Sequence, residues 1–385
     1  MKRISTILIA ALAVPACSSS DSTPSGDDGS GSNGSGSGDE WDQELATREF
    51  DYSAALRIAA LRLTGDLPTI TEINTVGTPT DLAAKKAAYE ALVTDYLSRP
   101  TFAAQMFYFW RDTFKLGETA EFDTAPALAA QLAATDGSYM SLLTQNANNC
   151  PTFDEGTGVF TPAECPGNGP KVGVLANPGV MKQFYGNFAF RRVKWVQETF
   201  DCAKFPIELG GAPVEIGAAS PFTGDWPFQS ISGPNNGGRV NFQDVSAVIC
   251  ANCHTTMNHI APLFANFDKD GAYQPQIAVT TPLDGAPLAE LSDYIPTGET
   301  TAWRFGQPVA DLPALGVAMA ADADVAKCGV ARMWNWALGK TDIVDTLQEV
   351  PIETIQTQVD AFTAGGFKMK SLIYAVYTSD DFTKF

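Results

Sequence analysis

The stretch Val248-Ile-Cys-Ala-Asn-Cys-His254 contains the pattern C-x-x-C-H. Two thiols spaced three residues apart can add to the two vinyl groups of one haem, and the adjacent histidine is then held against the iron as its proximal ligand. We therefore predict that Cys250 and Cys253 attach one haem c covalently and that His254 binds its iron. The sequence has no second C-x-x-C-H, so we expect one covalent haem.

The same cysteines have two other interpretations. A redox dithiol usually lies at a strand-to-helix turn of a thioredoxin-like unit. Here a Pro-, Gly- and Asn-rich stretch, residues 232–238, precedes the motif, and we expect an irregular chain after His254. A structural zinc site needs four Cys or His ligands, whereas His254 and His259 are the only histidines of the chain. Both alternatives stay open, but the haem interpretation accounts for more of the pattern.

The N-terminus predicts export. Lys2 and Arg3 precede an apolar run, residues 4–14, which is too short to span a bilayer as a helix. Val14-Pro-Ala-Cys17 resembles a bacterial lipobox, which implies cleavage before Cys17 and lipidation of its thiol, and the alternative is an ordinary signal peptide. We expect residues 1–16 to be a signal peptide and the mature chain to be lipid-anchored in the cell envelope, on the periplasmic face or the surface of a Gram-negative-type bacterium.

Composition predicts a tether and limits the partners. Residues 18–39 are almost entirely Ser, Gly, Asp and Asn, so we expect residues 17–44 to form a disordered tether behind the lipidated cysteine. The chain has 25 basic and 44 acidic residues, a formal net charge of −19. This charge argues against nucleic-acid binding and against flat docking on anionic lipid, and it permits docking to a basic redox partner protein. Membrane contact is expected through the lipid anchor only.

The rest of the sequence predicts a mainly α-helical haem protein with short β-hairpins and long irregular loops. We expect an N-terminal helical domain at 45–147, a haem-binding segment at 148–300, and a C-terminal helical domain at 301–385 that packs on the haem segment. Apolar spacing and capping signals predict helices over residues 56–64, 81–97, 101–114 and 127–143, and a further helix start at Thr69. In the third helix, Met106, Phe107, Phe109 and Trp110 form a stripe that we assign to the core, with haem packing as the alternative.

Four further cysteines, Cys150, Cys165, Cys202 and Cys328, predict two disulfides, because an even number of thiols in an exported chain favours pairing. Three pairings are possible. Cys150–Cys165 is favoured because it closes a loop of about 15 residues, which would contribute on the order of 3 kcal/mol. Cys202–Cys328 would then tie the approach to the haem segment to the last helices. The alternative is buried free thiols.

The distal face of the iron is less constrained by the sequence. His259 and Met257 follow His254 too closely to reach the opposite side of the ring. Met319, just before an expected C-terminal helix, is our first candidate for the distal ligand, because small class I cytochromes have a comparable order of motif, methionine and final helix. The other candidates are Met333, and then Met106 and Met181.

Basic residues are concentrated at Arg191, Arg192 and Lys194. This cluster has two interpretations: a solvated helix face, or a set of partners for the haem propionates.

The haem segment continues to Gly271 with the pattern C-x-x-C-H-x-x-M, followed by N-F-D-x-x-G. Further motifs are L-R-L-T-G-D-L-P at 61–68, R-P-T-F and W-R-D within 99–112, a Cys-to-A-L-G helix at 328–339, and a closing segment at 365–382. Together they resemble the planctomycete-type cytochrome c family, exported c-type haem proteins built from domains of unknown function. The resemblance extends over roughly two thirds of the chain, and Asn258-His259 stands where the family usually has Asp-Pro.

Three functions are compatible with these features. The first is one-electron transfer by a haem with His and Met ligands, which raises the reduction potential relative to two histidines. The second is a haem enzyme with an open distal site, peroxidase- or oxygenase-like, which would need a distal acid–base group. The third is a surface binding protein with a structural haem. We favour electron transfer and assign no catalytic residue.

Overall fold

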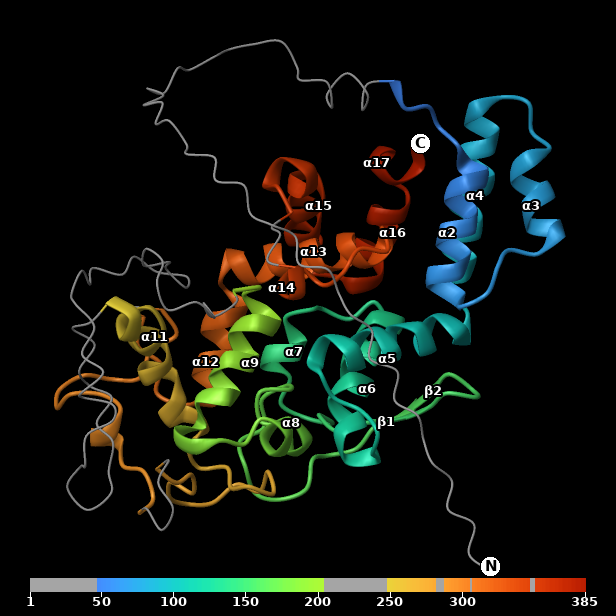
Figure 1. Ribbon diagram of the computed structural model, residues 1–385. Coiled ribbons are helices and arrows are strands. Elements are labelled where there is room, and N and C mark those ends of the chain that lie inside the picture. Colours follow the sequence, from blue (N-terminus) through green and yellow to red (C-terminus); the bar gives the residue numbers. More distant parts are fainter. Residues whose placement is uncertain (1–46, 204–247, 282–286, 305–306, 347–349) are drawn as a thin grey trace, which may run out of the picture. The chain divides into compact units, whose positions relative to one another are not determined.

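The computed structural model describes residues 47–203, 248–281, 287–304, 307–346 and 350–385 (Figure 1). The expected signal peptide, Cys17 and the expected tether lie outside the described residues. Residues Glu49–Phe385 form one compact unit, and the prediction of a mainly α-helical fold is confirmed. In chain order its elements are α2 (Tyr52–Thr64), α3 (Ile70–Gly77), α4 (Leu82–Tyr96), α5 (Pro100–Phe114), α6 (Ala120–Ala134), α7 (Ser141–Thr144), β1 (Thr152–Asp154), β2 (Val159–Thr161), α8 (Pro178–Gln183), η1 (Asn187–Ala189), α9 (Phe190–Phe200), α11 (Val248–Phe264), η3 (Leu291–Asp293), α12 (Leu312–Ala320), α13 (Ala323–Ala337), α14 (Ile343–Thr346), α15 (Ile352–Ala364), α16 (Met369–Tyr377) and α17 (Asp380–Thr383).

Capping residues set the boundaries of the first three described helices. Asp51 caps α2 and Asp81 caps α4, each by accepting backbone N–H bonds of the first turn. Thr69 and Glu72 form a reciprocal capping box at the predicted start of α3. Helix α2 ends at Gly65, whose φ of +80° is accessible to glycine without a steric penalty.

Two helices differ from the sequence prediction. The helix predicted over residues 127–143 instead begins at Ala120 and ends at Ala134, with Pro126 inside it. The chain after His254, expected to be irregular, continues as helix α11 through Pro262 to Phe264. A proline inside a helix removes one backbone hydrogen bond. In α6 the flanking residues are buried against α5, and this burial offsets the loss.

The aromatic stripe of α5 lies in the core, as predicted. Met106, Phe107, Phe109 and Trp110 are all buried, and α5 packs along α6 and against α2 and α9. The stripe therefore joins the N-terminal helices to α9, the helix that also contacts α11.

The two ends of the compact unit are paired through their backbones. Glu49 and Phe385 exchange N–H to carbonyl hydrogen bonds of 3.0 and 2.9 Å. Farther along, the hydroxyl of Tyr89 donates to the carbonyl of Tyr377 at 2.7 Å. The expected N-terminal and C-terminal helical segments therefore pack against each other within one unit.

Both predicted disulfides are present. Cys150–Cys165 encloses a short antiparallel hairpin, β1 with β2. Cys202–Cys328 joins the end of α9 to α13 across 126 residues of sequence. The second bond ties the two ends of the segment that contains α11, which is how the sequence predicted it would act.

An acidic cluster lies next to the second disulfide. The guanidinium of Arg304 contacts Asp201 at 2.9 Å, Asp322 at 2.6 Å and Asp324 at 3.0 Å. One cation cannot neutralise three carboxylates, and the side chain of Asp201 is only 4% exposed. Burial, together with the two neighbouring aspartates, raises the pKa of Asp201 to about 6 despite Arg304.

Asp201→Asn is expected to change how stability depends on pH. The folded-state pKa of about 6 lies above the ordinary aspartate pKa of 3.8, so the native state binds more protons between these values and stability falls as pH rises from about 4 to 6. The variant lacks this decline. The free energy of unfolding of the variant, relative to the wild type, should therefore rise by about 2 kcal/mol between pH 4 and pH 7. Denaturant unfolding at both pH values measures the difference, and a constant difference would contradict the assignment.

Candidate haem site

The predicted attachment motif lies at the start of α11, which packs against α9 and η1 (Figure 1). Positions 250, 253 and 254 have the three- and four-residue spacing that places positions on one face of an α-helix. The backbone therefore brings the three positions of the motif to one side of α11. The side chains of Cys250 and Cys253 lie outside the described part of the structure, so thioether attachment stays a prediction.

His254 is held by a residue one helical turn further along α11. Its Nδ1 lies 3.0 Å from Oδ1 of Asn258, and Asn258 is 3% exposed. Because an amide oxygen only accepts, Nδ1 donates and the neutral ring carries its lone pair on Nε2. Burial lowers the pKa of His254, and the bond to Asn258 offsets this only in part. The ring therefore has the neutral form that binds metal through Nε2.

Aromatic side chains pack beside His254. Phe190, the first residue of α9, meets the imidazole edge-on with ring centres 4.9 Å apart. Tyr294 packs edge-on against Phe190 at 6.0 Å and against Phe188 at 5.5 Å. Tyr294 is completely buried, and its hydroxyl has no hydrogen-bond partner among the described residues. Burial raises the pKa of Tyr294, so the phenol stays a neutral donor.

These residues fit a haem. Such a group needs an axial nitrogen, apolar contacts for its ring, and polar contacts for its carboxylates. His254 offers the nitrogen and Phe190 an apolar wall. An unpaired buried donor such as the Tyr294 hydroxyl costs free energy unless an acceptor satisfies it. The sequence alone did not single out Tyr294, because nothing in its local pattern marks it.

Arg192 anchors the C-terminal end of α11 from inside the core. It is completely buried, and its guanidinium donates to the carbonyls of Met181 (2.6 and 3.0 Å), Phe264 (2.9 Å), Phe267 (2.8 Å) and Asp268 (2.9 Å). Burial lowers its pKa to about 10. Of the predicted basic cluster, Arg192 is thus neither on a solvated face nor available to a haem carboxylate. The position of a cation at a helix C-terminus also complements the helix dipole.

His259 faces a different direction from His254. Five residues along an α-helix correspond to a rotation of about 140°, and Nε2 of His259 lies 3.0 Å from a carboxylate oxygen of Glu299. Its backbone carbonyl accepts the N–H of Ala302. These contacts connect α11 to the segment before α12, and they give His259 a role in packing.

Met319, the predicted distal ligand, is completely buried in α12. Helix α12 packs against α7 and α13, whereas α11 packs against α9 and η1. The main packing partners of α12 and of α11 are thus different elements, and these contacts do not place Met319 beside His254. Distal ligation by Met319 stays a prediction.

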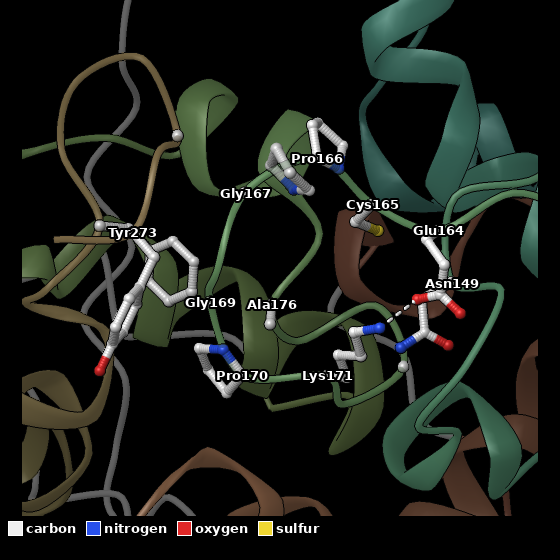
Figure 2. Close-up of a pocket in the computed structure, with 14 residues that line it drawn as sticks. Asn149, Glu164, Cys165, Pro166, Gly167, Gly169, Pro170, Lys171, Ala176 and Tyr273 are labelled. Carbon is white, nitrogen blue, oxygen red and sulfur yellow. Dashed lines mark ion pairs between the residues drawn. The ribbon is translucent and has the colours of Figure 1, made fainter.

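A separate small pocket lies beside the first disulfide. Figure 2 shows Lys171 and Glu164 forming an ion pair there, 2.8 Å from Nζ to Oε2. Asn149 is 3% exposed, and its Oδ1 has no partner among the described residues. The pocket has room for about one ordered water molecule. The pocket thus has the size and polarity of a water site rather than a metabolite site.

In the described ranges, no three His, Cys, Asp or Glu side chains converge where they could hold a metal ion. None of the helices in the described residues has the length and hydropathy needed to cross a bilayer. No family model, curated protein or solved structure matches the chain.

Proposed function

We propose that this chain is an exported c-type cytochrome with one covalent haem that passes single electrons to or from a protein partner. The observation that carries the proposal is the C-x-x-C-H motif on α11, combined with the hydrogen bond that engages Nδ1 of His254 and makes Nε2 the nitrogen that would bind the iron. The haem would supply an iron that alternates between ferric and ferrous states. Cys250 and Cys253 would attach it, His254 would be the proximal ligand, and Met319 is proposed as the distal ligand.

The residues around the motif have supporting roles in this proposal. Asn258 orients the imidazole through Nδ1, and Phe190 covers one edge of the ring. Arg192 fixes the far end of α11, so the motif sits on a helix that is held at its C-terminus. The acidic chain favours a basic partner protein, because opposite charges steer two proteins together.

Other residues support the proposed location in the cell envelope. Two disulfides are typical of proteins in oxidising environments outside the cytoplasm. Together with the lipobox-like Val14-Pro-Ala-Cys17, they support anchoring in the cell envelope through a lipid on Cys17. The mass of the mature N-terminal peptide tests this, since an unmodified Cys17 would exclude the anchor. Membership of the planctomycete-type cytochrome family is proposed on the quoted motifs.

Cys250→Ser combined with Cys253→Ser should abolish haem staining of the protein on a denaturing gel, because no thioether then links haem to the chain. Cys150→Ser combined with Cys165→Ser is the matched control. It removes two thiols that are paired with each other, so the stain should persist in whatever protein accumulates. Staining of the first variant at the wild-type level would refute covalent attachment at this motif.

Carbon monoxide separates electron transfer from the enzymatic alternative. A six-coordinate ferrous haem binds carbon monoxide slowly, because the distal ligand must first leave, whereas an open distal site binds it at once. Electron transfer therefore predicts slow binding to the reduced wild-type protein.

A further inference from the structure

We propose that Asn258 is a positioning residue that sets the reduction potential of the haem, by holding Nδ1–H of His254 with an uncharged acceptor. The inference rests on the proposed function, because it concerns the group behind the proximal ligand. It extends that function from the presence of haem to the control of its potential.

Two contacts restrict the orientation of the imidazole ring of His254. Asn258 Oδ1 lies 3.0 Å from Nδ1, and the edge of the ring meets Phe190 at a centroid distance of 4.9 Å and an interplanar angle of 87°. Both His254 and Asn258 belong to α11, one turn apart, so their separation is fixed by the helix itself. Asn258 is 3% exposed, and water therefore competes little for the hydrogen bond.

The charge of the acceptor matters because the ferric state carries one more positive charge than the ferrous state. An anionic acceptor draws the Nδ1 proton toward itself and makes the imidazole a stronger electron donor, which stabilises ferric iron. An amide oxygen does this less, because it carries no net charge. At the same position, a carboxylate should therefore lower the potential, and an apolar side chain should raise it.

A structural role alone makes a different prediction. If Asn258 only satisfied a buried imidazole, its replacement would change the stability of the fold. It would not produce an ordered series of potentials. The order of the potentials is therefore the readout that distinguishes positioning of the ligand from packing.

The experiment compares purified holoproteins of the wild type, Asn258→Asp and Asn258→Leu by redox titration. Asn258→Asp should favour ferric over ferrous haem about tenfold relative to the wild type, as expected for a change in the outer shell of a metal ligand, which is a fall of about 59 mV for one electron. Asn258→Leu should shift the potential in the opposite direction. Asn266→Asp is the control, since it adds the same charge eight residues further along the chain, beyond the end of α11, where the side chain donates to the carbonyl of Gln274. The reduction potential of Asn266→Asp should differ from that of the wild type by only a small fraction of the shift expected for Asn258→Asp.

A second measurement does not depend on how well the variants fold. Nitrogen-15 spectra of the wild-type holoprotein should show a slowly exchanging proton on Nδ1 of His254. An unprotonated Nδ1, or equal potentials in Asn258→Asp and the wild type with covalent haem retained, would overturn the inference alone. A wild-type protein that takes up no covalent haem would overturn the proposed function, and the inference with it.

Discussion

Arg192→Met is expected to lower the free energy of unfolding by about 4 kcal/mol, because it leaves buried carbonyl groups without donors. Among the described residues, the carbonyls of Met181 and Phe267 accept from Arg192 alone. Those of Phe264 and Asp268 also accept a backbone N–H. Two orphaned carbonyls at about 1–3 kcal/mol each account for the estimate.

Denaturant unfolding measures this change as a shift in midpoint at constant slope. Lys194→Met is the control, since Lys194 is an exposed residue of the same helix whose ion pair with Glu198 spans 3.7 Å. Surface pairs of this kind contribute little, so the control should stay within about 0.5 kcal/mol of the wild type. Equal losses in the two variants would mean that the carbonyl contacts of Arg192 contribute no more than a surface charge.

The role of Arg192 shows what a local pattern cannot predict. In the sequence it belongs to a basic run with Arg191 and Lys194, and such a run is usually solvated. Its carbonyl partners come from α8 and from the chain that ends α11, more than seventy residues further on in the case of Phe264. Only the tertiary fold brings these groups to one point.

Helices with clear end signals were predicted well. Helix α4 lies within the predicted residues 81–97, because it has a capping aspartate and an apolar face. Helix α13 overlaps the helix at 328–339 that the family resemblance implied. Two of the differences from the prediction, at α6 and α11, concern helices that contain a proline. Proline is a strong local signal against helix, but burial of the surrounding residues outweighs it in a folded core.

The residues of the candidate site also differ in how far the local sequence predicts them. His254 could be predicted because its neighbours in sequence define the motif. Asn258 lies four residues further on, a helical spacing that would have indicated the contact had α11 been predicted as a helix. Tyr294 reaches the site from a loop region forty residues away, next to η3, and no periodicity connects it to the motif.

Removal of the Cys202–Cys328 disulfide, by alanine at both positions, should cost more stability than removal of Cys150–Cys165. In the chain-entropy model, the cost grows with the logarithm of the number of residues that the bond encloses. The separations are 126 and 15 residues. The corresponding losses are about 5 and about 3 kcal/mol.

The longer loop also contains the proposed haem helix. Helix α11 packs on α9, and α9 is attached to α13 by the disulfide and by Arg332, which donates to the carbonyls of Glu198 and Thr199 at 2.8 and 3.0 Å. Because Arg332 keeps α9 and α13 together, the native fold should survive loss of the bond. The loss of stability should then come mainly from a higher conformational entropy of the unfolded chain. Thermal unfolding of the two double-alanine variants, each against the wild type, gives the comparison. A larger loss for the Cys150–Cys165 pair would mean that local packing around the hairpin, and not the length of the closed loop, decides what each bond contributes.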